Sequence, residues 1–265
     1  MSKWFSMSGR RALITGASLS IGRSIALGFA DHGAAIAVHY SAAADKAFGR
    51  PDAAQETRAA VQSRGVDGCL VEADLAEEDA GRRVVAAAIT ALGAVDILVI
   101  CASIQSRTPF LAVTADEIQR QFQINFRATV ELLQAALPAM KANRWGRVLT
   151  VGSINQVRPE PDLAIYAALK SAQHNLCINL ARQYAPFNVM INNLSPGLVA
   201  TERNRWRRED AEVWRDIQAT AARPIGRAAE PDEMVGGAIL LCSDAASYIA
   251  GTDLMITGGG HLPLV

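Results

Sequence analysis

The amino-acid sequence predicts a doubly wound α/β domain built on a parallel sheet of seven strands. Short apolar runs alternate along the 265 residues with longer, Ala-rich amphipathic stretches. Several runs, such as "DILVICA" at 96–102, are apolar at nearly every position, which is typical of strands covered by helices on both faces. No repeat, low-complexity tract or linker interrupts this alternation, so we expect a single domain over residues 1–265.

Each expected strand is a short apolar run, and each expected helix is a longer stretch with apolar residues at helical spacing. The strands are predicted at 11–15, 34–40, 67–73, 96–102, 146–152, 188–194 and 253–257. The helices are predicted near 20–32, 52–63, 77–91, 115–143, 163–185 and 231–242.

Two connections depart from this alternation of strands and helices. The first, 41–54, is unusually long and follows the second strand, and the second, 200–226, is polar and Arg-rich and follows the sixth strand. Loops at the carboxyl ends of parallel strands form the ligand crevice in such folds. We therefore expect both connections to border a binding site, with 200–226 as a lid over the substrate.

Composition excludes several classes of protein. The 26 basic and 26 acidic residues balance, whereas nucleic-acid and membrane-surface binders usually need a basic excess or patch. The four cysteines show neither CxxC nor zinc-ligand spacing, so we expect buried thiols in a reducing compartment and no metal. The N-terminus lacks the apolar region of a secretory signal, and no apolar run approaches the ~20 residues of a membrane span. A cytoplasmic protein is the expectation.

The first strand runs directly into a glycine-bearing turn and a helix, "TGASLSIGRSIALGFADHG" at 15–33. The free N–H groups at the start of such a helix form a site for a phosphate. Gly16 would permit the tight turn, and Gly22 would let the helix pack closely on the strand. A plain turn between strand and helix is the alternative at this point.

This stretch resembles the opening TGxxxGxG motif of the short-chain dehydrogenase/reductase family. Thr15, Gly16 and Gly22 match it, whereas Ser20 stands where the family has its middle glycine. The hydroxyl of Ser20 could bond a phosphate, although its Cβ restricts close approach of the dinucleotide. The resemblance extends from about residue 10 to 260 and implies a Rossmann-type fold and a nicotinamide cofactor.

Further family motifs imply where that cofactor would lie. "EADL" matches a pair that flanks adenine, and "SPGLVAT" matches a Pro-Gly turn followed by a threonine. At 100–103 the family has Asn-Asn-Ala-Gly and this chain has Ile-Cys-Ala-Ser, whose backbone could still line the cofactor with Cys101 packed against it rather than acting as a nucleophile. The implied cofactor-binding residues are Gly16, Ser18, Ser20, Ile21, Gly22, Tyr40, Ser41, Asp74, Leu75, Cys101, Ala102, Ser103, Tyr166, Lys170, Pro196, Gly197, Val199 and Thr201.

The strongest catalytic signal is Ser153 followed by "YAALK", which contains Tyr166 and Lys170. The latter two are four residues apart and share one face of a helix, while Ser153 follows a strand at the same sheet edge. A nearby ammonium lowers the pKa of a phenol, so Tyr166 could exchange a proton with a substrate oxygen that Ser153 holds. By resemblance, Lys170 also grips the nicotinamide ribose, and Asn125 positions a water that links Lys170 to solvent.

The choice between NAD and NADP depends on the end of the second strand, where a carboxylate would bond the ribose 2′-OH and select NAD. Tyr40 occupies that place, so we expect no carboxylate there to repel a 2′-phosphate. The hydroxyls of Ser18 and Ser41 could bond such a phosphate. Leu19 weighs against this, because NADP-using relatives often carry Arg or Lys at its position. The sequence thus favours NADP, with NAD as the alternative.

The substrate is a small alcohol or ketone by resemblance, and "TERNRWRRED" in the lid is its only local clue. These arginines either form a solvated face or meet an anionic or polyhydroxylated substrate. The candidate substrate contacts are Ser153, Asn155, Arg205 and Trp206.

A different class of function is a catalytically weak or inactive protein that senses dinucleotides and keeps the fold. Ser20 and the altered turn at 100–103 motivate it, whereas the complete set of Ser153, Asn125, Tyr166 and Lys170 favours an enzyme. The resemblance also implies a homotetramer, with helices 115–143 and 163–185 between subunits.

Overall fold

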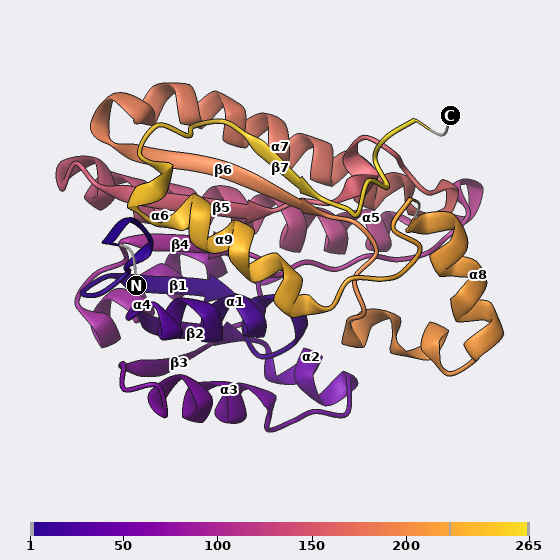
Figure 1. The fold of residues 1–265 in the computed structure, drawn as a ribbon, viewed down its shortest axis with the longest axis horizontal. Helices are drawn as coiled ribbons and strands as arrows, with labels where there is room; N and C mark the ends of the chain where they lie inside the picture. The colour runs from indigo at the N-terminus through magenta and orange to yellow at the C-terminus, as the bar shows by residue number, and fades with distance from the viewer. Residues whose placement is uncertain (1–2, 223, 264–265) are drawn as a thin grey trace.

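The computed structural model describes residues 3–222 and 224–263, and its centre is one parallel sheet (Figure 1). The strands lie in the order β3-β2-β1-β4-β5-β6-β7, which confirms the expected seven-stranded doubly wound fold. Their bounds are β1 Arg11–Thr15, β2 Ala35–Tyr40, β3 Gly68–Glu72, β4 Ile97–Ile100, β5 Gly146–Val151, β6 Val189–Pro196 and β7 Asp253–Ile256.

The strand order reverses at β1, which pairs with β2 on one side and with β4 on the other. Leu13 is in register with Ala37 of β2 and with Leu98 of β4. Because all strands run parallel, their carboxyl ends meet at one edge, and the reversal opens a crevice there between the loops after β1 and β4.

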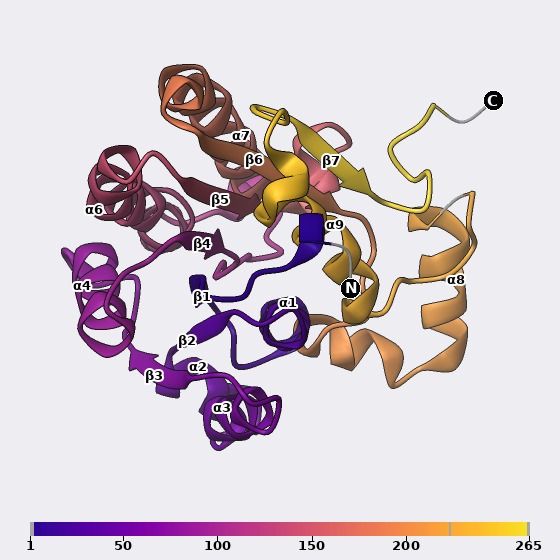
Figure 2. The ribbon, with the colours of Figure 1, turned by 60° about the vertical axis from the view of Figure 1, so that its left-hand side comes forward.

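Helices cover both faces of the sheet (Figure 2). On one face, Ile14 of β1 belongs to the same buried cluster as Phe29 of α1, and on the other face Leu13 belongs to the cluster of Leu132 in α6. This alternation explains the continuously apolar strands, since both sides of each strand are buried. The first face carries α1 (Ser20–Asp31), α3 (Ala53–Gln62) and α9 (Val235–Cys242); the second carries α4 (Ala80–Leu92), α6 (Ala128–Ala142) and α7 (Ala164–Tyr184).

Three further helices lie toward the carboxyl edge of the sheet (Figure 1): α2 (Ala42–Ala47), α5 (Ala115–Phe122) and α8 (Ala211–Ala221). The connection after β2, expected without regular structure, contains α2, whose first turn Ser41 caps by accepting from the N–H of Ala44 at 3.4 Å. The helix expected over 115–143 is interrupted by a π-helix, Gln123–Arg127. Such single turns are common at functional sites, and Asn125 lies within this one.

The connection after β6 also departs from a plain loop. It begins with a 3₁₀ segment, Glu202–Arg208, and continues into α8. Among the residues that the structure describes, no helix is both long and apolar enough to cross a membrane.

The junction of β1 and α1 depends on a glycine that leaves no room for a side chain. A Cβ on Gly22 would lie 2.1 Å from the carbonyl oxygen of Gly16. That oxygen belongs to a turn held at positive φ, +65° at Gly16 itself, so the backbone cannot move away without opening the turn. The predicted role of Gly22 in close helix–strand packing therefore has a direct steric basis.

We expect Gly22→Ala to destabilise the protein by about 1–3 kcal/mol, the usual cost of forcing an extra methyl into packed structure. The free energy of unfolding in urea measures this change. Gly236→Ala is the matched control, because Gly236 is a helical glycine with no atom within 4 Å of an added Cβ. That control should gain up to about 1 kcal/mol from helix propensity. Equal stability of the two variants would contradict the steric assignment.

Candidate active site

A pocket of about 990 Å³ opens at the carboxyl edge of the sheet, where the strand order reverses. Loops that follow β1 to β6 line it, together with α2 at one end and the segment 201–221 at the other. Parts of both long connections, within 41–48 and 201–221, thus line this pocket.

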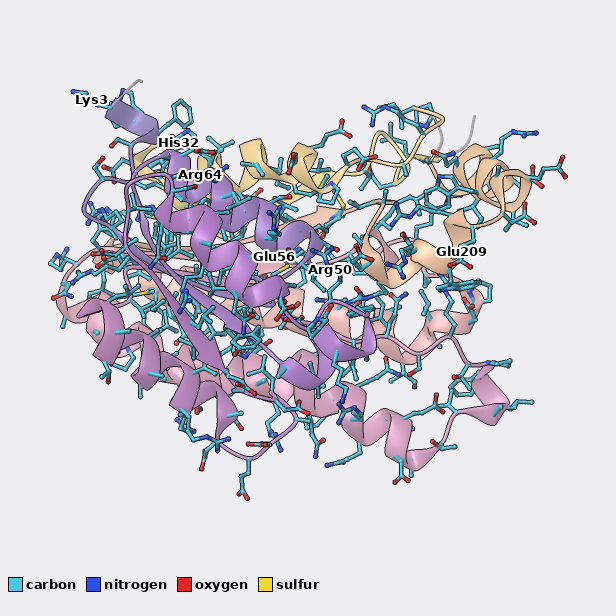
Figure 3. The ribbon with its side chains drawn as sticks, turned by 90° about the horizontal axis from the view of Figure 1, so that it is seen from below. Lys3, His32, Arg50, Glu56, Arg64 and Glu209 are labelled. Carbon is cyan, nitrogen blue, oxygen red and sulfur yellow. The ribbon has the colours of Figure 1, made fainter. Side chains whose placement is uncertain are left out.

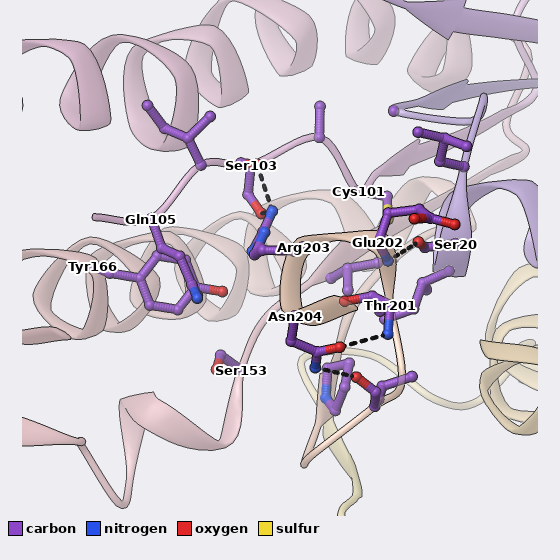
Figure 4. Close-up of a pocket in the computed structure, with 18 of the residues that line it drawn as sticks. Ser20, Cys101, Ser103, Gln105, Ser153, Tyr166, Thr201, Glu202, Arg203 and Asn204 are labelled. Carbon is purple, nitrogen blue, oxygen red and sulfur yellow. Dashed lines mark hydrogen bonds between the residues drawn. The ribbon is translucent and has the colours of Figure 1, made fainter. Parts of the chain in front are cut away.

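The glycine-rich loop keeps its shape despite the serine in it. Ser20 adopts φ +49°, a left-handed conformation that costs a non-glycine residue roughly 1–2 kcal/mol. Its hydroxyl accepts a hydrogen bond from the N–H of Glu202 at 3.1 Å, which ties this loop to the lid segment (Figure 4). Ser20 thus links the two walls of the pocket, a role that the middle glycine of the motif could not perform.

The altered turn after β4 is held by Thr15 rather than by its own side chains. The Thr15 hydroxyl oxygen accepts from the N–H groups of Cys101 at 3.0 Å and Ala102 at 3.1 Å. Burial raises the pKa of the Cys101 thiol to about 11, so the thiol is neutral near pH 7 and a poor nucleophile. Cys101, Ala102 and Ser103 of this turn all line the pocket.

Tyr166 and Ser153 line the same pocket, and Lys170 lies beneath them. The three residues are 6%, 8% and 1% exposed, respectively. The Lys170 ammonium donates to the carbonyl of Val151 at 2.7 Å and to the side-chain oxygen of Gln173 at 3.1 Å. Its Nζ is 5.8 Å from the centre of the Tyr166 ring, as expected for residues one helical turn apart.

The electrostatics of this cluster favour the Tyr166 phenolate. Burial alone would raise the pKa of Tyr166, but the positive charges of Lys170 and Arg203, together with the Ser153 hydroxyl, outweigh it and lower the pKa. Burial also lowers the pKa of the Lys170 ammonium. A phenol with a lowered pKa is suited to take up and return a proton near neutral pH.

The Asn125 side chain holds the loop after β4 in place. It accepts from the N–H of Ile104 at 2.9 Å and donates to the carbonyl of the same residue at 2.8 Å. The backbone carbonyl of Asn125 lies 3.5 Å from the side-chain nitrogen of Gln173, which also donates to Thr129 at 2.9 Å. Gln173 therefore connects Lys170 to the π-helix, a link that sequence reasoning missed although the residue lies one turn beyond Lys170.

Most of the expected cofactor-binding residues meet at this pocket. Those that line it are Gly16, Ser18, Ser20, Ile21, Gly22, Ser41, Asp74, Leu75, Cys101, Ala102, Ser103, Tyr166, Pro196, Gly197, Val199 and Thr201. Lys170 and Asn125 lie behind the lining. Tyr40 is not among the lining residues, because its hydroxyl turns away and donates to Glu72 at 3.2 Å.

His39 faces the pocket in place of Tyr40, since neighbouring strand residues point to opposite sides. Its Nδ1 accepts from the N–H of Gly16 at 3.2 Å. Burial lowers the pKa of His39 to about 4, so the ring is neutral near pH 7.

A buried carboxylate lies beside Ser18, which corrects the expectation that none is present near the end of the second strand. Asp45 of α2 is 2% exposed and lines the pocket, and one of its oxygens accepts from the Ser18 hydroxyl at 2.7 Å. The other oxygen, Oδ2, has no hydrogen-bond partner in the part of the chain that the structure describes. Sequence reasoning missed Asp45 because it looked for the acid at the strand end, and α2 delivers this one from five residues beyond Tyr40.

These features fit an adenine dinucleotide. The glycine turn and the start of α1 offer N–H groups to a diphosphate. The unpartnered oxygen of Asp45 can accept from a ribose hydroxyl, an interaction that would offset the cost of burying the carboxylate. Asp74 and Leu75, which are the predicted adenine contacts, also line this pocket.

The lid places its arginines differently from the sequence prediction. Arg205 is outside the pocket lining, and its side chain is 59% exposed and 3.4 Å from Glu202. Arg203 instead reaches across to donate to the carbonyl of Ser103 at 2.6 Å (Figure 4). Trp206 and Asn155 line the pocket as expected, and the N–H of Asn155 donates to the Ser153 hydroxyl oxygen at 3.2 Å.

No cluster of three or more His, Cys, Asp or Glu side chains able to hold a metal ion occurs in residues 3–222 and 224–263.

Comparison with known proteins gives consistent matches over the whole chain. The family described as Enoyl-(Acyl carrier protein) reductase matches residues 16–261. L-rhamnose 1-dehydrogenase (NAD(P)(+)) of Sphingomonas sp. is 29% identical over 259 residues, which cover 97% of this chain and 98% of that protein. The structure of 3-oxoacyl (acyl-carrier-protein) reductase of Agrobacterium tumefaciens C58 with NADP bound is 40% identical, with a TM-score of 0.89 and coverage of 96% and 95% of the two chains. A gluconate 5-dehydrogenase of Burkholderia cenocepacia J2315, in complex with NADP and tartrate, is 30% identical, with a TM-score of 0.88 and 99% of each chain covered.

Asp45 leads to a prediction about cofactor choice. We expect Asp45→Asn to shift the ratio of the dissociation constants of NADPH and NADH toward NADPH by about tenfold, because a carboxylate repels a 2′-phosphate and accepts from a 2′-hydroxyl. Fluorescence titration with the two reduced cofactors measures the ratio. Asp52→Asn removes the same charge from the same connection at an exposed position, and it should leave the ratio unchanged. An equal change in both constants for Asp45→Asn would contradict the prediction.

Proposed function

The chain belongs to the short-chain dehydrogenase/reductase family, and from this premise we propose that Tyr166 is the acid/base of its reaction, assisted by Ser153 and Lys170. It is an NAD(P)-dependent oxidoreductase that interconverts a secondary alcohol and a ketone. The observation that carries the proposal is the convergence of Ser153, Tyr166 and Lys170 at one pocket, with a lowered pKa for Tyr166.

Proton transfer follows from the protonation state of Tyr166. In oxidation, the phenolate takes the proton of the substrate hydroxyl, and in reduction the phenol returns a proton to the carbonyl oxygen. The Lys170 charge stabilises the phenolate, and Gln173 and the Val151 carbonyl hold that ammonium in place. The Ser153 hydroxyl, which also accepts from Asn155, orients the substrate oxygen toward the phenol.

The remaining part of the reaction needs the nicotinamide cofactor, which supplies the hydride acceptor or donor. NAD or NADP would be held by the glycine turn, the turn after β4 and the Pro196-Gly197 turn, all of which line the pocket. The sequence favoured NADP over NAD because it showed no carboxylate at the end of the second strand. Asp45 weakens that argument, because it places a carboxylate in the same pocket.

Assembly and location extend the proposal. We propose a homotetramer in which α5, α6 and α7 lie between subunits; the partly exposed Ile118, Phe122 and Ile178 support it, since a subunit contact would cover them. A cytoplasmic location is supported by the four cysteines, all of them free thiols.

The central experiment replaces the phenol alone. Tyr166→Phe should lower kcat by a factor of about 10² or more, because general acid–base catalysis typically contributes 10²–10⁴-fold. Cofactor oxidation and reduction across a panel of alcohols and ketones measures activity, and fluorescence titration measures binding of the reduced cofactor, which should persist. Tyr248→Phe, at a residue that is 100% exposed, is the matched control.

The same experiment separates an enzyme from a dinucleotide sensor. A sensor would bind cofactor without turning over any member of the panel, and Tyr166→Phe would then change nothing. Full activity of Tyr166→Phe would refute the assignment of Tyr166 as the acid/base.

The pH dependence gives a second prediction. Because oxidation needs the phenolate, its kcat/KM should rise with pH through the pKa of Tyr166, which Arg203 helps to lower. Removing the positive charge in Arg203→Gln should raise that pKa and move the rising limb to higher pH. Arg215→Gln, at an exposed position of α8, should leave the limb in place. A shift to lower pH in Arg203→Gln would contradict the electrostatic account.

A further inference from the structure

The end of the pocket beyond Tyr166 carries an excess of positive charge that the reaction chemistry does not require. Four arginines line it, Arg107, Arg158, Arg203 and Arg207. Two acidic side chains are close to them, and both are bound to Arg107: Glu160 at 2.7 Å and Asp162 at 2.8 Å. The other three arginines have no carboxylate partner among the described residues.

Arg203 is the arginine nearest the reacting groups. It donates through one terminal nitrogen, Nη2, to the carbonyl of Ser103 at 2.6 Å and to the hydroxyl of the same residue at 3.0 Å. Its charge influences both Tyr166 and Lys170, which places the guanidinium within a few ångströms of the phenol. Figure 4 shows the side chain extending from the lid between the turn after β4 and Ser153. The guanidinium also hydrogen-bonds the Tyr166 side chain, which lowers the pKa of the phenol, and no carboxylate forms a salt bridge with it in the part of the chain that the structure describes.

Arg207 lies one helical turn further along the same segment. Burial lowers its pKa, and repulsion by Arg107 lowers it further, so the two guanidinium groups share one region of the pocket. Glu160 and Asp162 form salt bridges with Arg107 and act on Arg207 only at longer range. Arg207 forms no salt bridge among the described residues and lies 5.9 Å from the ring of Trp206. Arg158 donates to the carbonyl of Gly260, a neutral acceptor.

Other arginines on this surface show that the pattern is selective. Arg50, which is outside the pocket lining, is paired with Glu56 at 2.7 Å, and the two lie side by side in Figure 3. Arg205, between Arg203 and Arg207 in sequence, is close to Glu202 and faces solvent. The lid therefore directs Arg203 and Arg207 into the pocket without an acidic partner. Partly buried guanidinium groups without a counter-ion are costly, and a bound anion would offset that cost.

We propose that the substrate is a hydroxy acid whose carboxylate is bound by Arg203, with Arg207 strengthening the positive field behind it. The N–H groups of Arg203 that Ser103 and Tyr166 do not use can donate to a carboxylate in a charge-assisted hydrogen bond. This inference rests on the proposed function, because it places the carboxylate beside the carbon that the Tyr166 site oxidises.

The reaction is the oxidation of the secondary alcohol to a ketone by NAD(P)⁺. The secondary alcohol of the hydroxy acid gives its hydroxyl proton to Tyr166 and the hydrogen on its carbinol carbon, with the electron pair, to NAD(P)⁺. The products are the oxo acid and NAD(P)H, and the carboxylate is unchanged. Reduction of the oxo acid is the same step in reverse.

The test compares short hydroxy acids of graded length with the neutral polyols in which each carboxylate is replaced by a CH₂OH group, for example gluconate with sorbitol and tartrate with threitol. We expect KM for at least one acid to be at least tenfold below that of its neutral partner. Arg203→Gln and Arg207→Gln should each raise the ratio of KM for the acid to KM for its neutral partner about tenfold or more, whatever change both substrates share. Arg215→Gln, exposed on α8 and outside the pocket lining, is the charge-matched control.

A binding measurement makes the result independent of turnover. Calorimetric titration of the cofactor-loaded protein with the same pairs should show tighter binding of the acid, lost in Arg203→Gln. If neutral alcohols are oxidised and the acids are neither bound nor turned over better, the inference is wrong and the proposed function stands. If the acids bind through Arg203 and no member of the panel is turned over, the carboxylate site stands, and the proposed function fails together with the assignment of the acid as substrate. If Arg203→Gln weakens cofactor binding alone, the guanidinium serves the cofactor and the inference is overturned.

Discussion

The close approach of Gly16 to Ala102 holds the whole site together. A Cβ on Gly16 would lie 3.0 Å from the Cα of Ala102, so only glycine lets the turn after β1 touch the turn after β4. Thr15 locks the same contact through the N–H groups of Cys101 and Ala102. This junction sits where the strand order reverses, and it sets the position of the crevice into which α1, the β4 turn and the lid all converge.

From this junction, a polar network leads to the phenol of Tyr166. The Asn125 side chain holds the backbone of Ile104 just beyond the β4 turn, and its backbone carbonyl accepts from the side chains of Thr129 and Gln173. Gln173 in turn holds the Lys170 ammonium, whose charge lowers the pKa of Tyr166. Buried polar groups are costly unless they are bonded, so this network fixes the geometry of the catalytic cluster before any ligand arrives.

Two residues show how the chain compensates for its departures from the family motifs. Ser20 accepts the strain of a left-handed conformation and gains a bond to the lid, and Ser103 provides a hydroxyl and a carbonyl to Arg203. Both changes connect the cofactor side of the pocket to the lid segment. Ser20 and Ser103, at which the chain departs from the family motifs, are therefore the points where the two walls of this pocket meet.

Sequence alone was sufficient for the strands, their parallel arrangement and the Ser153, Tyr166 and Lys170 cluster. Strand burial leaves a local apolar pattern, and residues four apart on a helix must share a face, whatever the rest of the fold does. Asp45, Gln173 and the inward-facing Arg203 depended on tertiary structure. Their roles arise from contacts between segments far apart in the chain, 27 residues for Ser18 with Asp45 and 100 for Ser103 with Arg203, and from the direction in which α2 and the lid turn. No local pattern encodes such directions, since each of these side chains would be equally compatible with a solvated surface until its neighbours in space are known.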